Sequence, residues 1–141
     1  MLLARIASTS EAVAATRSRL NKIALLSDCL RQLDPQELPL GVSYLMGSLP
    51  QGKIGLGYAS IKQVQTEPAI TTSLTLADTD AMFEHISKLQ GTGSKAQRLQ
   101  LLGRLMQRAS REEQVFLQFS ATRLAQFGIT ASEIMNTLVE Q

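Results

Sequence analysis

Reactive and aromatic side chains are scarce in this 141-residue chain, which has no tryptophan, one histidine, one cysteine and 4% aromatic residues. The single thiol, Cys29, cannot form a disulfide within the chain, so we expect a reducing, cytoplasmic location. One imidazole, that of His85, and one thiol are too few for a metal site, and we expect both residues to be structural. No apolar run approaches the roughly 18 residues of a membrane-spanning helix, and no Gly-x-x-x-x-Gly-Lys-Ser/Thr phosphate loop occurs. We therefore expect no catalytic centre, metal, cofactor or membrane contact on this chain.

The apolar residues that are present favour helices over strands. Leucine, alanine and methionine dominate them, and the aromatic residues that favour sheets are few. A chain of this length forms one hydrophobic core. We predict an all-α fold in a single domain over residues 1–141: a compact orthogonal bundle of about five to six helices joined by glycine-rich loops.

Capping residues and apolar periodicity place the predicted helices along the chain. Five long helices are expected over residues 10–33, 35–46, 78–89, 95–109 and 110–127, and a short one over 58–64. Thr130 with Glu133 is expected to cap a last helix that runs to the chain end. The predicted N-caps of the five long helices are Ser10, Asp34, Asp78, Ser94 and Ser110. Glu112 and Glu113 are adjacent, so on a helix they point about 100° apart and cannot form a facing acid–base pair. We interpret these two acids as stabilising a helix start, Glu113 as part of a capping box with Ser110.

Charge is segregated along the chain although the net charge is only +2. Residues 88–123 hold seven basic residues against two acidic ones, whereas residues 63–87 hold four acidic residues and no lysine or arginine. Such segregation favours a polyanionic partner. A solvated helix face that is merely basic explains the charge about equally well.

Two glycine-containing loops have the composition of phosphate-binding segments. Glycine lets backbone N–H groups approach a phosphate, and a following helix N-terminus adds unsatisfied donors. The candidate contacts are Gly52, Lys53, Gly55, Gly57, Gly91, Thr92, Gly93, Ser94, Lys95 and Arg98. Tight connectors between packed helices would explain each loop alone, but their combination with the basic segment favours contact with a nucleic-acid backbone.

Short motifs in a fixed order carry a family resemblance over most of residues 3–119. They are Thr9-Ser10, Val13-Ala14, Ser18-Arg19, Leu45-Met46-Gly47-Ser48-Leu49-Pro50, Ile54-Gly55-Leu56-Gly57, Gly91-Thr92-Gly93-Ser94 and Glu112-Glu113-Gln114-Val115-Phe116-Leu117. Together they resemble the N-terminal domain of ATP-dependent DNA ligases of the bacterial and archaeal type.

The resemblance implies a non-catalytic domain that binds duplex or nicked DNA along the minor groove, without sequence preference, in DNA repair, replication and recombination. It also implies a nucleoid-associated location in a prokaryote. In such ligases an adenylation domain with a Lys-x-Asp-Gly motif and an oligonucleotide-binding-fold domain complete a ring around the DNA. No Lys-x-Asp-Gly occurs in this chain, so ATP and a divalent metal would belong to those partner domains.

The resemblance weakens towards the C-terminal end. The family pattern Leu-x-Gly-x-Leu-Arg-x-Gly is replaced at residues 121–128 by a segment that keeps only the final glycine, Gly128. We therefore expect a domain that is truncated or divergent at this end. The divergence leaves open an alternative function, a helical protein-interaction scaffold that has lost its ligase partner domains.

Overall fold

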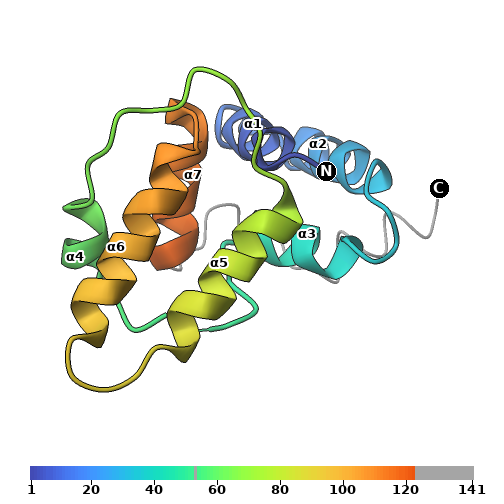
Figure 1. Cartoon of the computed structure of the whole chain (residues 1–141). Coiled ribbons are helices and arrows are strands. Elements are labelled where there is room, and N and C mark those ends of the chain that lie inside the picture. Colours follow the sequence, from blue (N-terminus) through green and yellow to red (C-terminus); the bar gives the residue numbers. More distant parts are fainter. Residues whose placement is uncertain (53, 123–141) are drawn as a thin grey trace.

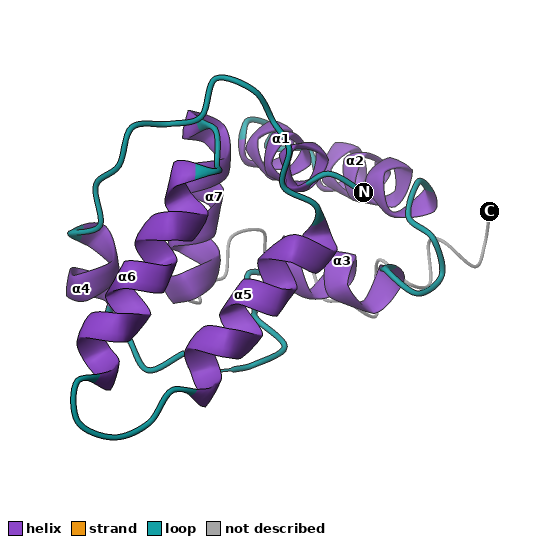
Figure 2. Ribbon diagram, in the orientation of Figure 1, coloured by secondary structure: helices purple, strands orange, loops and turns teal. Residues whose placement is uncertain are grey.

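The computed structural model describes residues 1–52 and 54–122, and this part of the chain is all-helical, as predicted (Figures 1 and 2). Its seven helices are α1 (Leu3–Ala14), α2 (Arg19–Arg31), α3 (Leu38–Leu45), α4 (Tyr58–Lys62), α5 (Leu76–Lys88), α6 (Ser94–Gln107) and α7 (Arg111–Thr122). The described residues contain no strand, and Leu2 and Thr75 form an isolated antiparallel bridge. None of the described helices is long and apolar enough to cross a membrane.

The first helix of the prediction, from Ser10 to Leu33, is wrong because the chain forms two helices there. Ser10 is buried inside α1, which already begins at Leu3. The Ser18 hydroxyl accepts a hydrogen bond from the Asn21 N–H at 3.2 Å and so caps α2, the helix that follows the turn. The turn lets α1 and α2 pack against each other, which a continuous helix could not do.

Two further predicted helix starts are shifted along the chain. The carbonyl of Asp34 accepts the Glu37 N–H at 2.9 Å in a turn, and α3 begins only after it, at Leu38. Thr75, not Asp78, is the N-cap of α5. The Thr75 hydroxyl accepts the Asp78 N–H at 3.0 Å, and the Asp78 carboxylate accepts the Thr75 N–H at 3.3 Å, which completes a capping box.

The starts of α6 and α7 lie close to their predicted positions. Gly93 is the N-cap of α6 with φ of 81°, a conformation that suits glycine, so Ser94 is the first helical residue and not the predicted cap. The predicted capping box of α7 is confirmed, because the Ser110 N–H donates to the Glu113 carboxylate at 2.8 Å and the Glu113 N–H to the Ser110 hydroxyl at 3.3 Å. The predicted continuation of this helix over residues 123–127, the predicted last helix and most of the divergent 121–128 segment lie outside the described residues.

One hydrophobic core joins the helices. α1 packs against α2, α3 and α7, α4 packs against α7, and α5 and α6 form a hairpin. Its largest fully buried side chains are Tyr44, Phe83, Leu3, Ile6, Leu26, Leu30, Leu45, Ile61, Leu74, Leu76, Ile86 and Leu102. The long connection between α4 and α5 has little regular structure, as predicted, and is tied to α6 and α7 by bonds such as Ala69 N–H to the Ala109 carbonyl at 2.9 Å.

Candidate nucleic-acid interface

The loop between α3 and α4 is anchored by apolar side chains and exposes glycines. Leu49 and Ile54 are buried, whereas Gly55 and Gly57 are exposed and Gly52 is partly exposed. Gly52 and Gly55 have φ of 72° and 80°, so the loop takes turns that other residues rarely adopt. The apolar anchors hold the loop in place while its glycine backbone faces outward.

The loop between α5 and α6 presents a second exposed glycine backbone. Gly91, with φ of 92°, Thr92 and Gly93 are all exposed. The Ser94 N–H donates to the Gly91 carbonyl at 3.2 Å, which closes a turn immediately before α6. No side chain caps the N-terminus of α6, and exposed Lys95 lies in its first turn. An uncapped helix N-terminus next to a lysine is a favourable place for an anion.

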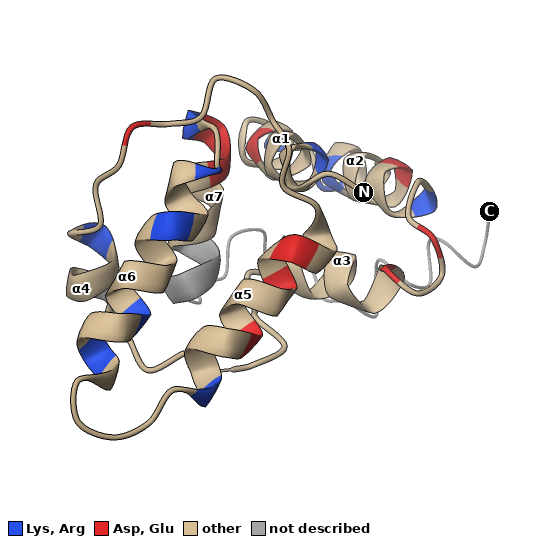
Figure 3. Cartoon of the chain, viewed as in Figure 1, with Lys and Arg blue, Asp and Glu red and all other residues tan. Residues whose placement is uncertain are grey.

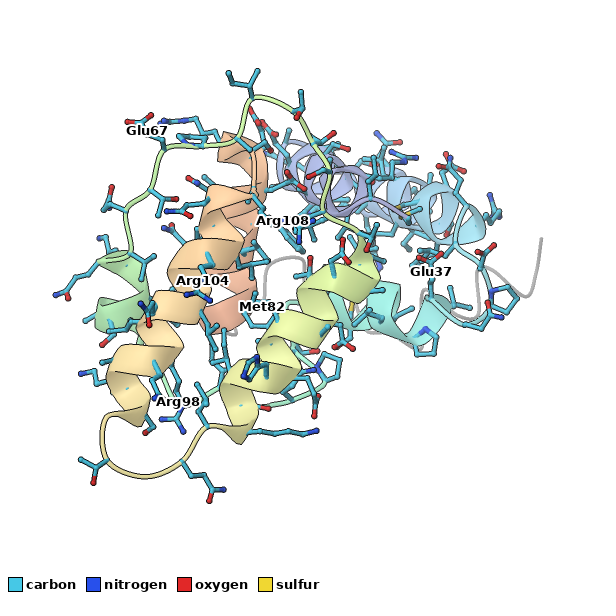
Figure 4. The ribbon with its side chains drawn as sticks, in the orientation of Figure 1. Glu37, Glu67, Met82, Arg98, Arg104 and Arg108 are labelled. Carbon is cyan, nitrogen blue, oxygen red and sulfur yellow. The ribbon has the colours of Figure 1, made fainter. Side chains whose placement is uncertain are left out.

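Arg98 on α6 contacts both loops, and its side chain is labelled in Figure 4. Its guanidinium donates from Nε to the Ile86 carbonyl at 3.4 Å and from Nη2 to the Leu89 carbonyl, at the C-terminal end of α5. The same guanidinium lies against Gly55, where an added Cβ would come within 2.6 Å of Cζ. The structure therefore brings together two loops that lie far apart in the sequence.

Basic side chains continue from the loops along α6 and its neighbours (Figure 3). Exposed Arg104 makes no ion pair or hydrogen bond with any described residue, and exposed Lys62 lies on the short helix α4. Two other cations face acids of α5: Arg108 approaches Asp78 at 3.5 Å and Lys88 approaches Glu84 at 3.7 Å. The charge segregation seen in the sequence thus places exposed basic residues on α6 and acidic residues on α5.

An open groove between α4 and α6 lies beside the basic residues. Its polar lining is dominated by four glutamines, Gln63, Gln65, Gln97 and Gln100. Glutamine amides both donate and accept hydrogen bonds, so they can bond phosphate and sugar oxygens as well as base edges. The sequence analysis did not single out this groove, because its residues come from two helices whose packing only the structure shows.

The two residues that were predicted to be structural are an exposed one in the last turn of α5 and one inside the core. His85 is exposed on α5, and Cys29 is fully buried, where desolvation raises the pKa of its thiol. Among the described residues, no three histidine, cysteine or acidic side chains are grouped so that they could hold a metal ion.

Nine of the ten predicted contact residues lie within the two loops and the first two turns of α6, and Lys53 lies outside the described residues. Gly57 differs from the other loop glycines because it has φ of −84° and forms the N-cap of α4. The sequence analysis missed Lys62 and Arg104 as candidate contacts. The excess of basic residues in 88–123 was a signal for Arg104, and Lys62 directly follows the first loop in the predicted short helix.

Comparison with known proteins places both loops inside a recognised family. A family model described as DNA ligase N terminus matches residues 50–138. The chain is 44% identical over 118 residues to a probable DNA ligase of Streptomyces avermitilis, covering 84% of this chain and 23% of that protein. It is 43% identical over 117 residues to a probable DNA ligase of Nocardia farcinica, covering 83% and 22%. A probable DNA ligase of an Anaeromyxobacter species is 43% identical over 119 residues, covering 83% and 23%. The chain spans less than a quarter of the length of these relatives.

Proposed function

Because the chain belongs to the DNA ligase N-terminus family, as its motifs predicted, we propose that it is a non-catalytic module that binds duplex or nicked DNA. The observation that carries this proposal is the placement of two exposed glycine backbones side by side, joined through Arg98. Neither loop has a side chain at its glycines to keep a phosphate away from the backbone N–H groups. Binding of this kind reads the sugar-phosphate backbone and is independent of base sequence.

The two loops would contact the DNA backbone in complementary ways. The loop of residues 52–57 would contribute backbone N–H groups from Gly55 and Gly57 and the charge of Lys53. Gly52 would shape the loop, because its N–H donates to the Leu49 carbonyl at 2.9 Å and it has no side chain in the way of a phosphate. The second loop would contribute Gly91, Thr92, Gly93 and Ser94, with Lys95 and the uncapped N-terminus of α6 attracting a phosphate. The glutamine-lined groove would add hydrogen bonds to sugars and base edges in the minor groove.

The catalytic chemistry would reside in the remainder of a longer ligase. The relatives are more than four times as long as the matched segment, and this chain has no Lys-x-Asp-Gly motif. We propose that an adenylation domain and an oligonucleotide-binding-fold domain act beside this module and supply the sites for ATP and a divalent metal. The module itself would hold the nicked duplex for them in DNA repair, replication and recombination.

Fluorescence anisotropy with a labelled nicked duplex tests the proposal, with salt varied between about 50 and 200 mM. The slope of log affinity against log salt is negative, and each lost phosphate contact makes it less steep by about 0.9. Lys53→Glu with Lys95→Glu should therefore make it less steep by about two and abolish tight binding. Arg31→Glu on α2 is the control, because Arg31 is exposed and pairs with Asp28 of its own helix at 3.2 Å and not with either loop.

The proposal fails if the unmodified chain binds the duplex at low salt no better than the doubly substituted chain. Such a result would favour the alternative of a helical protein-interaction scaffold. Equal losses for Arg31→Glu and Lys95→Glu would also contradict it, because the contact would then depend on net charge and not on the loops.

A further inference from the structure

Arg98 is bonded to the end of a neighbouring helix rather than extended into solvent. Its side chain is partly buried, and its Nε and Nη2 donate to the carbonyls of Ile86 and Leu89. Carbonyls at the end of a helix have few partners within the helix, and an arginine fork can reach two of them at once. The Ile86 carbonyl also accepts the Leu89 N–H at 3.3 Å, so Arg98 is its second donor. Leu89 begins the loop that ends at α6, and Arg98 itself lies on α6. These bonds therefore tie the start of the loop to the helix at its end.

The other loop rests on the same guanidinium. A Cβ at Gly55 would lie 2.6 Å from Cζ and 2.8 Å from both Nε and Nη1 of Arg98. Real Cβ atoms do not approach other atoms this closely, so the position admits only glycine while the arginine stays where it is. The φ of 80° at Gly55 requires glycine independently of this contact.

We propose that Arg98 is a positioning residue that holds both glycine loops in the geometry for phosphate contact and does not itself bind a phosphate. This inference rests on the proposed DNA-binding function. It distinguishes Arg98 from Lys95, which lies one turn earlier on α6, is exposed and makes no ion pair or hydrogen bond with any described residue. Lysine cannot replace Arg98, because an ammonium group lacks the planar fork that reaches two carbonyls and lies flat on a peptide.

The first test uses the free chain and measures backbone amide exchange. Arg98→Lys and Arg98→Gln should each speed exchange about tenfold at the hydrogen-bonded amides of the two loops, the loss expected for about one hydrogen bond to a charged group. These amides are Gly52 and Ile61 at the two ends of the first loop and Leu89 and Ser94 at the two ends of the second, which donate to the carbonyls of Leu49, Gly57, Ile86 and Gly91. Exchange in α1 and α2 should not change, which excludes global unfolding. Arg31→Gln is the matched control and should leave both loops unchanged.

The second test measures affinity for the labelled nicked duplex across the same salt range. Both Arg98 variants should bind about tenfold more weakly, with a salt slope equal to that of the unmodified chain. Lys95→Gln should instead make the slope less steep by about 0.9. If Arg98→Gln does not fold, Arg98→Lys carries both measurements, because it keeps the charge and the aliphatic stem and removes only the planar fork.

The inference would be overturned if Arg98→Lys bound with the affinity of the unmodified chain and Arg98→Gln had a less steep salt slope, because Arg98 would then be a phosphate ligand. Unchanged amide exchange in both loops would overturn it as well. If the unmodified chain does not bind the duplex, the proposed function fails and the positioning role fails with it. Faster loop exchange in the free Arg98 variants would then show a structural contact alone.

Discussion

Glu113 provides the sharpest test of how this fold is held together, because it is the one fully buried carboxylate among the described residues. Its Oε1 accepts the Ser110 N–H at 2.8 Å, whereas Oε2 is buried and has no hydrogen-bond partner there. The sequence analysis assigned this acid to the start of α7, and the structure confirms the capping box. We expect Glu113→Ala to destabilise the chain more than the loss of an exposed cap would.

The magnitude follows from three contributions. A hydrogen bond to a charged group contributes about 1.5–3 kcal/mol, and its loss leaves the Ser110 N–H unpaired. The attraction between the carboxylate and the N-terminus of α7 adds about 0.3–1 kcal/mol. Removal of a buried charge with one unpaired oxygen offsets part of both. The expected net loss is about 2 kcal/mol, or a fall in Tm of about 8 °C for a domain of this size.

Urea and thermal unfolding followed by circular dichroism measure this loss. Glu113→Gln keeps an acceptor for Ser110 and removes the charge, so it should lose less than about 1 kcal/mol. Glu112→Gln removes an exposed acid from the same helix turn and is the control, with an expected loss below about 0.5 kcal/mol. A Glu113→Ala variant as stable as the unmodified chain would refute the reasoning. An equal loss of stability in Glu113→Gln and Glu113→Ala would refute it too, because the oxygen that accepts the Ser110 N–H would then not account for the stability.

Three further predictions concern stability. A hydrogen bond from the N-terminal amino group lowers the pKa of Glu37 below its ordinary value, and one from the Thr75 N–H does the same for the pKa of Asp78. Carboxylates with depressed pKa values stabilise the fold above their ordinary pKa and lose this effect as pH falls through the lower value. Acid titration of the free energy of unfolding should therefore show a loss below about pH 4.5 that is smaller in Glu37→Gln; an identical loss would contradict this. Thr75→Ala removes the N-cap of α5 and should cost about 1 kcal/mol in urea unfolding, whereas a neutral effect would show that the cap is dispensable. Phe83→Ala empties a fully buried site and should cost about 3–5 kcal/mol, so a loss below about 1 kcal/mol would show that the core collapses around the gap.

Local signals in the sequence predicted the starts of α4, α6 and α7 to within about one residue, and they failed where two candidate caps competed. The capping box of α7 was found because its hydroxyl, its acid and their spacing occur together. Ser10 and Ser18 both suit an N-cap, but only Ser18 is one, because burial of Ser10 inside α1 depends on packing against other helices. Asp78 was taken for a cap because Asp is a strong N-cap residue, whereas its true place is the third position of the box that Thr75 begins.

The sequence also located both loops of the candidate interface but not the contact that joins them. Glycine and lysine patterns are local, so each loop could be recognised on its own. The contact between Gly55 and Arg98 depends on how the α5–α6 hairpin sits on the loop before α4, which no local pattern encodes. The sequence analysis interpreted Arg98 as a phosphate contact, and its hydrogen bonds to the carbonyls of Ile86 and Leu89 are likewise visible only in the structure.

This difference changes what the basic segment is expected to do. Of the seven basic residues in 88–123, Lys88 and Arg108 face acids, Arg98 bonds to carbonyls and Arg123 lies outside the described part. The remaining three, Lys95, Arg104 and Arg111, make no ion pair or hydrogen bond with any described residue. These three together with Lys53 of the first loop give four phosphate contacts and a salt slope of about −4, whereas contacts from Lys88, Arg98 and Arg108 as well would give about −6. A measured slope near −6 would therefore mean that DNA displaces the ion pairs and the Arg98 bonds, and the loops would rearrange on binding.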